Sequence, residues 1–155
     1  MATAQLRWAT PNDIEQVSQL LEEYHRQEGL RGHSRERIRS VLEDLFEMPN
    51  RGRVLVAAEE DGDIAAYALV VRRPSFEWAS DVAVIDEIFV KGKARERGLG
   101  RRMINFVEEY AATEGLPSIT LEVSVLNVSA REFYRSVGFS KVDRDIYARN
   151  VSGPR

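Results

Sequence analysis

Apolar residues recur along this chain with two spacings, which alternate from one segment to the next. A spacing of three and four residues, typical of amphipathic helices, predicts four helices, which begin at Pro11, after Ser34, at Leu99 and near Val128. Short apolar runs between turn residues predict six strands, at Leu6–Ala9, Val54–Glu59, Ile64–Val71, Val82–Val90, Ile119–Val125 and Phe139–Ala148. The order β-α-α-β-β-β-α-β-α-β predicts an α/β fold of the mixed α+β kind. We expect a single mixed, mostly antiparallel sheet with helices on both faces.

Residues with special backbone roles mark two of the boundaries. Thr10, Pro11 and Asp13 have the order expected at a helix start, with Thr10 as the cap. Asp61 and Gly62 predict a tight hairpin turn between two strands.

Length and composition are those of an ordinary globular protein. The chain has 155 residues, of which 43% are hydrophobic and 30% are charged, and this is enough for one substantial core. We expect one domain over residues 1–150 and a frayed tail over residues 151–155. Residues 72–81 are predicted to form a loop.

Charge and residue usage exclude several classes of function. The net charge of −3 argues against a nucleic-acid binder, which needs a basic face, and leaves cationic small molecules open as partners. Cysteine is absent, which excludes disulfides, thiolate metal sites and a cysteine nucleophile. No apolar run is long enough to span a membrane, and the first residues lack the apolar segment of a secretory signal. We therefore expect a cytoplasmic protein that binds neither nucleic acid nor membrane.

The stretch from Lys91 to Arg102 has six basic residues and three glycines where a predicted strand meets a predicted helix. The amides of a helix's first turn lack intrahelical partners, and the helix dipole favours an anion there. Glycine also lets a ligand approach the backbone closely. The stretch predicts a phosphate-binding turn, with a solvated basic turn as the alternative.

Two well-known phosphate-binding loops do not match this stretch. A P-loop has the spacing Gly-x4-Gly-Lys-Ser/Thr, whereas Gly92 and Gly98 are too far apart and Leu99 follows. A dinucleotide-binding turn needs a small residue where Met103 stands.

The pattern that remains, Arg95-x-x-Gly98-x-Gly100, resembles motif A of the GNAT superfamily of N-acetyltransferases. In that family the loop amides hold the pyrophosphate of acetyl-CoA. The segment from Asn127 to Phe139 resembles the second motif, in which an asparagine precedes a helix with a tyrosine and a Gly-Phe pair opens the last strand. Two linked motifs at the right separation are more specific than either alone. The resemblance implies the GNAT acyl-CoA N-acyltransferase fold, in a single N-acetyltransferase domain.

A closer similarity is to the diamine (spermidine/spermine-type) acetyltransferase branch. It is carried by Trp78 and by the segment from Val84 to Val90, where two acidic residues stand in an apolar strand. It implies acetyl transfer to a primary amine of a small molecule, polyamine-like or another cationic amine, and a homodimer by family analogy. Two alternatives stay open: a protein N-terminus or lysine as the acceptor, and a non-catalytic acyl-CoA-binding module.

The resemblance also implies an acetyl-CoA site that needs no metal. Backbone groups of Ile88, Phe89 and Val90 would pair with the pantetheine arm, and Asn127, with Ala130 nearby, would contact the pantetheine or a neighbouring backbone. The pyrophosphate would lie on the turn, against Arg95, Glu96, Arg97, Gly98, Leu99, Gly100 and Arg101. The 3′-phosphate would be reached by one of Arg95, Arg97, Arg101 and Arg102.

Direct attack by an amine requires a base. An alkyl amine has a pKa near 10, so at pH 7 only about one molecule in 10³ is nucleophilic. Asp86 and Glu87 are the candidates, directly or through a water. Strand alternation sends them to opposite faces unless a bulge redirects them, and the resemblance favours Asp86 as the inward-facing carboxylate. The alternative is that both are ordinary polar strand residues.

Tyr134 matches the family's general acid, which protonates the departing thiolate. Full transfer from a phenol to a thiolate is uphill by roughly 2 kcal/mol, so its expected contribution is modest. The alternative is an aromatic residue that packs beside Phe133.

The acceptor side is defined by composition alone. An acidic and aromatic mouth for a cation is predicted from Tyr24, Glu28, Glu77 and Trp78. His25 and His33 are isolated in the sequence, which is poor evidence for a metal site or a catalytic base.

Overall fold

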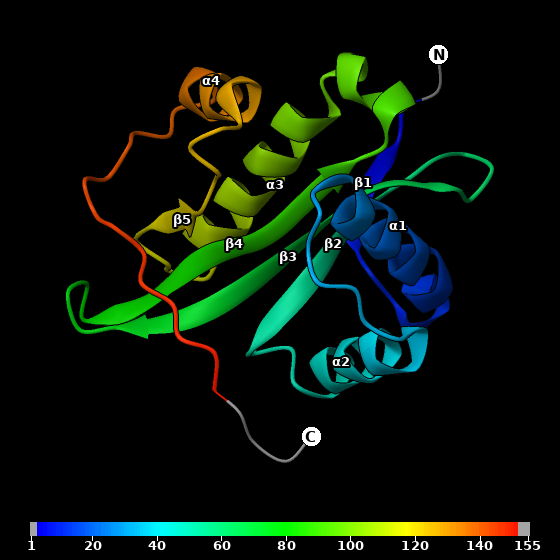
Figure 1. Ribbon diagram of the computed structural model, residues 1–155, viewed down its shortest axis with the longest axis horizontal. Coiled ribbons are helices and arrows are strands. Elements are labelled where there is room, and N and C mark those ends of the chain that lie inside the picture. The colour runs from blue at the N-terminus through cyan, green and yellow to red at the C-terminus, as the bar shows by residue number, and fades with distance from the viewer. Residues whose placement is uncertain (1–2, 152–155) are drawn as a thin grey trace. The chain divides into compact units, whose positions relative to one another are not determined.

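The computed structural model describes residues 3–151, which form five strands, four α-helices and two short 3-10 helices (Figure 1). The strands are β1 (Gln5–Trp8), β2 (Gly52–Ala58), β3 (Ile64–Ser75), β4 (Ser80–Val90) and β5 (Ile119–Leu121). The helices are η1 (Pro11–Asp13), α1 (Ile14–Gln27), α2 (Arg35–Glu47), η2 (Gly92–Arg97), α3 (Leu99–Thr113) and α4 (Val128–Ser136). None of the helices within the described range is both long and apolar enough to cross a bilayer.

The chain forms two compact units, Met1–Glu122 and Val123–Arg155. The first contains the whole sheet and α1 to α3, and the second contains α4. A single domain over residues 1–150 stays a prediction.

The strands of the first unit form one mixed sheet in the order β1-β2-β3-β4-β5. Neighbours from β1 to β4 are antiparallel, whereas β5 is parallel to β4. The parallel pairing is short, because only Ala83–Ile85 pair with Ile119–Leu121. The predicted mixed, mostly antiparallel sheet is confirmed.

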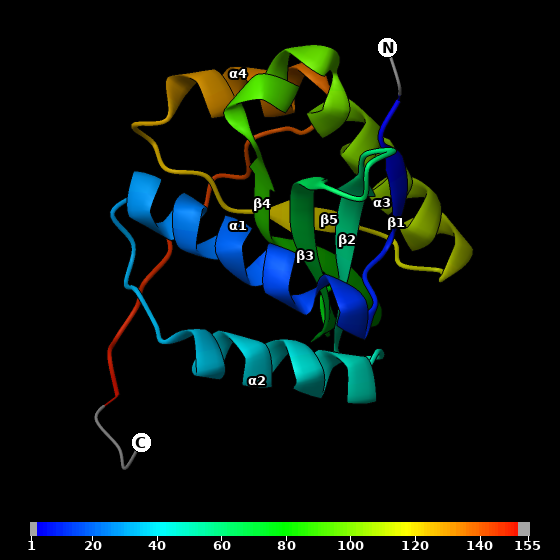
Figure 2. The same cartoon turned by 90° about the vertical axis from the view of Figure 1, so that its right-hand side faces the viewer.

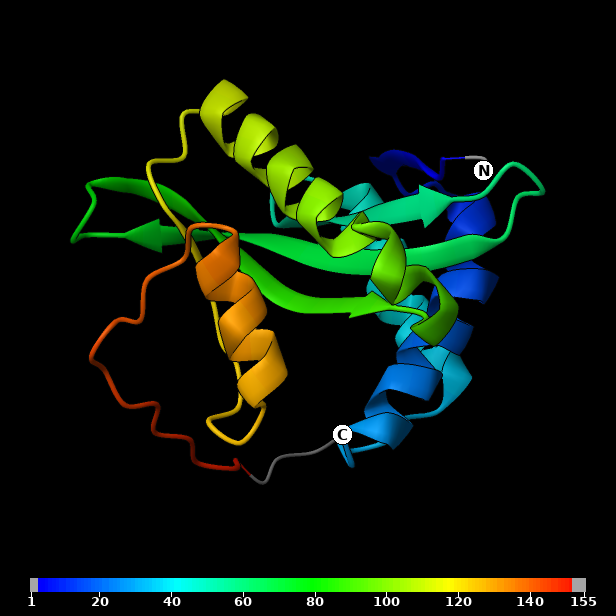
Figure 3. The same ribbon diagram turned by 90° about the horizontal axis from the view of Figure 1, so that it is seen from above.

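Helices cover both faces of this sheet, with α1 and α2 on one face and α3 on the other (Figure 2). Figure 3 shows α3 crossing the sheet over β3 and β4. Residues 54–57 of β2 are buried in succession rather than alternately, because both faces of the strand meet a helix. Val17, Leu42 and Tyr67 belong to the core beside α1 and α2, and α3 contributes Met103, which is fully buried.

The hairpin of β3 and β4 is longer than predicted. Residues 72–75 and 80–81 continue the two strands, so the expected loop over residues 72–81 is wrong except at its centre. Its outer part is polar: Arg72 pairs with Asp81 at 3.4 Å and with Glu114 at 3.0 Å. A two-stranded ribbon buries little apolar surface, so the hydrophobic pattern does not reveal it.

The predicted last strand is also wrong. Residues 139–151 of the second unit form no strand in the part of the chain that the structure describes. Val142, Ile146 and Tyr147 supply the apolar pattern of a strand, but their side chains are exposed. Strand propensity needs a pairing partner and a surface to pack on, and this unit offers neither to these residues. The tail predicted at residues 151–155 lies outside the described residues except for Val151.

Asp13 anchors the start of α1 in the way its spacing from Thr10 predicts. Its carboxylate accepts hydrogen bonds from the Thr10 amide at 2.7 Å and from the guanidinium of Arg7 at 2.7 and 2.9 Å. Only 5% of Asp13 is exposed. The Arg7 hydrogen bonds lower the pKa of Asp13 more than its burial raises it, so the charged form is the one that stabilises the fold.

We predict that Asp13→Asn lowers the free energy of unfolding by about 2 kcal/mol at pH 7, because charge-assisted hydrogen bonds at a helix start are lost. A carboxyl whose folded pKa is depressed stabilises the fold above its unfolded pKa and loses that effect as pH falls. The difference from the wild type should therefore shrink as pH falls from about 5 to 3 in urea unfolding curves. Asp44→Asn, at an exposed position on α2, is the control and should change little. A deficit that stays constant down to pH 3 would contradict this role.

Candidate functional site

An extra residue in β4 decides where its two acidic side chains point. Ile85 pairs with Val70 and Glu87 pairs with Leu69, so Asp86 has no partner of its own on β3. Neighbouring residues of β3 face opposite sides of the sheet, and their partners Ile85 and Glu87 therefore do so too. The bulge redirects the strand as one inserted residue does, so Asp86 and Glu87 share one face instead of taking opposite ones.

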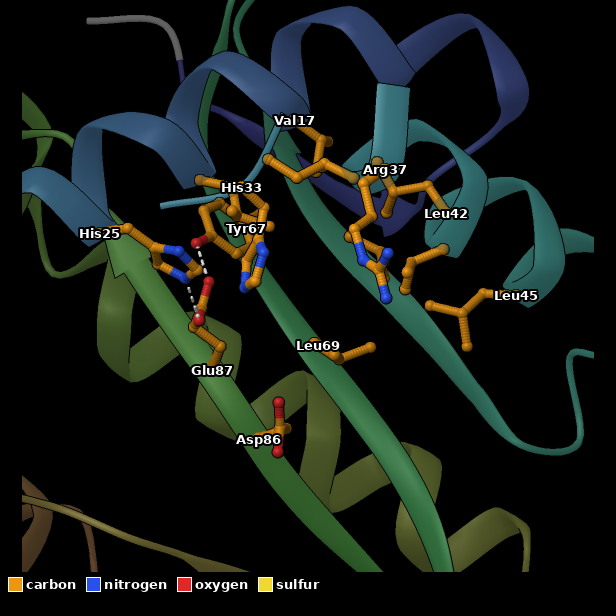
Figure 4. Close-up of a pocket in the computed structure, with 14 residues that line it drawn as sticks. Val17, His25, His33, Arg37, Leu42, Leu45, Tyr67, Leu69, Asp86 and Glu87 are labelled. Atoms are coloured by element: carbon orange, nitrogen blue, oxygen red, sulfur yellow. Dashed lines mark hydrogen bonds and ion pairs between the residues drawn. The ribbon is translucent and has the colours of Figure 1, made fainter. Parts of the chain in front are cut away.

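A cavity of about 240 Å³ lies on that face, between the sheet and the helices α1 and α2. Asp86 and Glu87 line it from β4, and both side chains point into it (Figure 4). Most of the remaining wall is apolar, including Val17, Leu42 and Leu69. A charged pair in a mostly apolar cavity interacts with a ligand more strongly than it would in water.

Glu87 is held by side chains from two other elements. The hydroxyl of Tyr67 on β3 donates to one carboxylate oxygen, and His25 Nε2 on α1 lies 2.8 Å from the other (Figure 4). Tyr67 is only 2% exposed. Its burial, and then the negative charge of Glu87, raise the pKa of Tyr67, so the phenol keeps its proton and remains the donor. The carboxylate is therefore fixed in position and in the role of acceptor.

Asp86 differs from Glu87 in having no such support. Its side chain is exposed and makes no ion pair or side-chain hydrogen bond with any residue that the structure describes. A carboxylate of this kind can bind a cation or accept a proton from one.

Four residues that line this cavity were not predicted as site residues from the sequence. They are His25, His33, Arg37 and Tyr67, all of which line the cavity. The histidines are far from Glu87 in the sequence, and only the packing of α1 brings His25 to it. Tyr67 had a usable signal, since it is the one large residue in the run Ala65–Ala68.

The predicted acceptor residues do not lie together. Tyr24 packs on Phe89 with ring centroids 5.5 Å apart, and burial followed by the charges of Glu87 and Glu28 raises the pKa of Tyr24. Trp78 lies in the turn between β3 and β4, at the opposite end of β4 from Phe89. At 3.3 Å per residue, that is roughly 30 Å away. Trp78 and its neighbour Glu77 are thus separated from Tyr24 and from Glu28 at the end of α1.

The other predicted site begins where β4 separates from β5. Beyond Ile85, no strand of residues 3–122 pairs with the edge of β4 that faces away from β3. Within this unit, the backbone groups that Ile88 to Val90 direct to that edge are therefore available to a ligand, except the Val90 carbonyl, which accepts a hydrogen bond from Arg95 Nε. A ligand with amide groups can pair with such an edge as an added strand would.

The turn that follows β4 has the backbone expected of an anion site. Gly98 has φ 67° and ψ 15°, the left-handed conformation, which glycine adopts without strain. It is the residue before α3, so the first amides of that helix point out of the turn. Leu99 is buried, whereas residues 95–98 are exposed.

Several cations of this turn are bound within the protein. Arg97 pairs with Glu59 through two contacts, of 2.7 and 3.3 Å. Arg102 donates to the Ala4 carbonyl at 2.6 Å, and Arg95 Nε donates to the Val90 carbonyl at 3.0 Å. These contacts fix the turn on the sheet and reduce the number of arginines that can turn toward a phosphate without breaking a bond.

The second unit contains the remaining predicted residues. Asn127 caps α4, because its Oδ1 accepts from the Ala130 amide at 3.1 Å. Tyr134 is half-buried and packs on Phe133 and Phe139, with ring centroids at 5.3 and 5.8 Å. These contacts give Tyr134 a packing role in its own unit, and its role as an acid stays a prediction.

A metal site is not part of this geometry. Within residues 3–151, no group of three or more histidine, aspartate or glutamate side chains is arranged to hold a metal ion.

Comparison with known proteins gives the same family as the motifs. Residues 14–139 match the model of the acetyltransferase (GNAT) family. The aminoglycoside N(6′)-acetyltransferase type 1 of Serratia marcescens is 24% identical over 118 residues, which are 74% of this chain and 80% of that protein. The uncharacterized N-acetyltransferase YhfO of Bacillus subtilis (strain 168) is 27% identical over 96 residues, 61% of this chain and 63% of its own.

Solved structures agree on the fold. The aminoglycoside N-acetyltransferase AAC(6′)-Iy, solved in complex with CoA, superposes with a TM-score of 0.85 at 18% identity, over 97% of this chain and 96% of that one. A possible acetyltransferase of Clostridium difficile 630 has the same TM-score at 16% identity, over 97% of this chain and 99% of that one.

We predict that the free energy of unfolding falls less steeply with rising alkaline pH in Tyr67→Phe than in the wild type. A tyrosine ionises near pH 10 in the unfolded chain, whereas folded Tyr67 keeps its proton. Its contribution to the free energy of unfolding therefore falls by about 1.4 kcal/mol per pH unit above that pH. In urea unfolding between about pH 9.5 and 11, the free energy of unfolding should therefore fall less steeply for the variant than for the wild type.

Tyr147→Phe removes an exposed tyrosine and is the matched control, with an expected slope like that of the wild type. Equal slopes for all three proteins would contradict the buried position of the Tyr67 hydroxyl.

Proposed function

Because the chain belongs to the GNAT family of acetyltransferases, we propose that this acetyl-CoA-dependent enzyme acetylates the primary amine of a small molecule. The relatives named as aminoglycoside acetyltransferases support a small-molecule amine. The polyamine acceptor of the diamine branch has no counterpart among these relatives. A peptide or protein amine stays the alternative acceptor, and a cytoplasmic location and a homodimer stay predictions.

The bulge in β4 is the observation that carries this proposal. It places Asp86 and Glu87 on the wall of one cavity, and β4 ends at Val90, where the turn that leads to Gly98 begins. An amine in that cavity is thus close to a thioester placed along the open edge of β4. The two carboxylates favour the ammonium form of the acceptor on entry, by charge pairing in a mostly apolar cavity.

The residues on the open side of β4 suit acetyl-CoA. The edge of β4 that faces away from β3 has no strand partner along Ile88 to Val90 among residues 3–122, and this edge matches the amides of a pantetheine arm. The left-handed Gly98 and the first turn of α3 match a pyrophosphate. Arg101 and Arg95 lie on the exposed part of the same turn and add positive charge near the phosphates. Acetyl-CoA supplies an activated acetyl group there.

Asp86 is the residue to which we assign the proton. The ammonium of the acceptor gives a proton to Asp86, directly or through a water, and the free amine attacks the acetyl carbonyl. A C–N bond forms, the C–S bond breaks, and the thiolate leaves with the sulfur electrons. The second proton of the nitrogen passes to water as the amide forms. Tyr134 gives its proton to the thiolate and takes one back from water.

Glu87 has a different part in this proposal. Because Tyr67 and His25 hold both of its oxygens, it is a fixed negative wall that orients the ammonium beside Asp86. Removing its charge should weaken amine binding more than it slows the proton transfer.

We predict that Asp86→Asn lowers kcat by roughly 10² to 10³ at pH 7, the range for loss of a general base. Only amine that is already neutral can then react, and its fraction rises tenfold per pH unit below a pKa near 10. The deficit should therefore shrink between about pH 7 and 9.5. Thiol release from acetyl-CoA, measured with a panel of small amines, reports this directly.

Glu87→Gln is the companion variant and should raise the KM for the amine more than it lowers kcat. An Asp86→Asn deficit that does not change with pH would remove Asp86 as the base. Wild-type protein that binds acetyl-CoA but releases no thiol with any amine, peptides included, would contradict the proposed transfer itself.

We predict that Gly98→Val raises the KM for acetyl-CoA about tenfold or more while the KM for the amine changes little. A β-branched residue is strained at positive φ, although no atom lies within 4 Å of the position of its Cβ. Gly92→Val is the matched control in the same turn, because that glycine has equal space and no positive φ. A larger effect on the amine KM than on that of acetyl-CoA would contradict the placement of the cofactor.

A further inference from the structure

Among the three arginines of α2, Arg37 is the one whose guanidinium has no partner within the part of the chain that the structure describes. Its neighbours on that helix are paired: Arg35 with Glu15 at 2.8 Å and Glu22 at 2.9 Å, and Arg39 with Glu15 at 3.6 Å. The guanidinium of Arg37 makes no ion pair or hydrogen bond with any residue that the structure describes. It lines the acceptor cavity instead.

The cavity therefore has opposite charges on two walls. Asp86 and Glu87 enter from β4, whereas the positive charge is that of Arg37, which enters from α2 (Figure 4). The carboxylates form no ion pair with Arg37, so neither wall neutralises the other. A ligand with a charge of each sign would satisfy both.

The rest of the wall is apolar and the space is small. Aliphatic side chains from both helices and from the sheet form most of the remaining lining, including Val17, Leu21, Leu42, Leu45 and Leu69. A volume of about 240 Å³ is below the usual 300–1,000 Å³ range of sites for drug-sized ligands. A ligand of the size of an amino acid suits such a space.

We infer that the acceptor is an α-amino acid or a similar amino-carboxylate with an apolar side chain. This inference rests on the proposed acetyl transfer to an amine and names its substrate class. The ammonium lies against Asp86 and Glu87, and the carboxylate lies against Arg37, whose planar fork of donors matches a carboxylate. The aliphatic wall takes the side chain. Acetylation removes the positive charge of the ligand, so the product loses its attraction to the acidic wall.

Three amines with the same branched carbon chain isolate the contribution of the carboxylate to kcat/KM. Racemic leucine has both charges, leucinamide has a neutral carboxamide in place of the carboxylate, and 3-methylbutylamine lacks the group altogether. With purified full-length protein and acetyl-CoA, we expect kcat/KM for leucine to exceed that for each of the others by tenfold or more. An equal or higher value for 3-methylbutylamine would overturn the inference while leaving acetyl transfer to an amine intact.

Arg37→Gln tests the residue itself. We expect it to lower the preference for leucine over 3-methylbutylamine by at least tenfold, and Arg37→Lys to restore part of it. Arg39→Gln removes the same charge from the same helix outside the cavity and should keep the wild-type preference. A preference that is unchanged in Arg37→Gln, or lost equally in Arg39→Gln, would contradict a carboxylate contact at Arg37.

Calorimetric binding of leucine, without acetyl-CoA, provides a readout that does not depend on turnover. Leucine binding that weakens tenfold or more in Arg37→Gln supports the assignment even if no acetylated product forms, in which case the transfer reaction is the part that fails. Leucine that neither binds nor reacts, while another amine is acetylated, overturns the amino-carboxylate class alone.

Discussion

An inserted residue in β4 decides which face of the sheet its two acidic side chains take. Regular alternation would give one acidic residue to each face of the sheet, and the pairing of β3 with β4 shows that Asp86 breaks it. Two carboxylates consequently share the wall of a mostly apolar cavity. Charges of the same sign repel one another when brought together, so the arrangement favours a positive ligand between them.

The surrounding elements make that arrangement stable. Tyr67 and His25 satisfy the carboxylate of Glu87, so its burial does not leave an unpaired charge in the core. Asp86 has no such support among residues 3–151, and in the proposed reaction it is the carboxylate that accepts the proton of the amine. The two carboxylates therefore differ because their contacts differ. Glu87 is held in place by Tyr67 and His25, whereas Asp86 can contact a ligand.

Local signals in the sequence were sufficient for most of the fold. The capping residues at Thr10 and Asp13, the Asp-Gly turn and the helical spacing all act within a few residues, and the structure has the elements they predict. Signals that depend on distant partners failed. The apolar pattern of residues 139–148 pairs with no strand among residues 3–151, and the polar ends of the β3 and β4 hairpin have no apolar pattern. The acidic pair was found from its unusual place in a strand. His25 and Arg37 could not be found, because only the packing of α1 and α2 brings them to the cavity.

The placement of the acceptor amine beside Asp86 is the claim on which the account depends. A crystal structure of the protein with CoA and a bound acceptor amine tests it most directly. The account predicts the amine nitrogen in the cavity beneath α1 and α2, within hydrogen-bonding distance of the Asp86 carboxylate and with its charge facing Glu87. An acceptor bound elsewhere, or a β4 without the extra residue so that Asp86 faces α3, would contradict it.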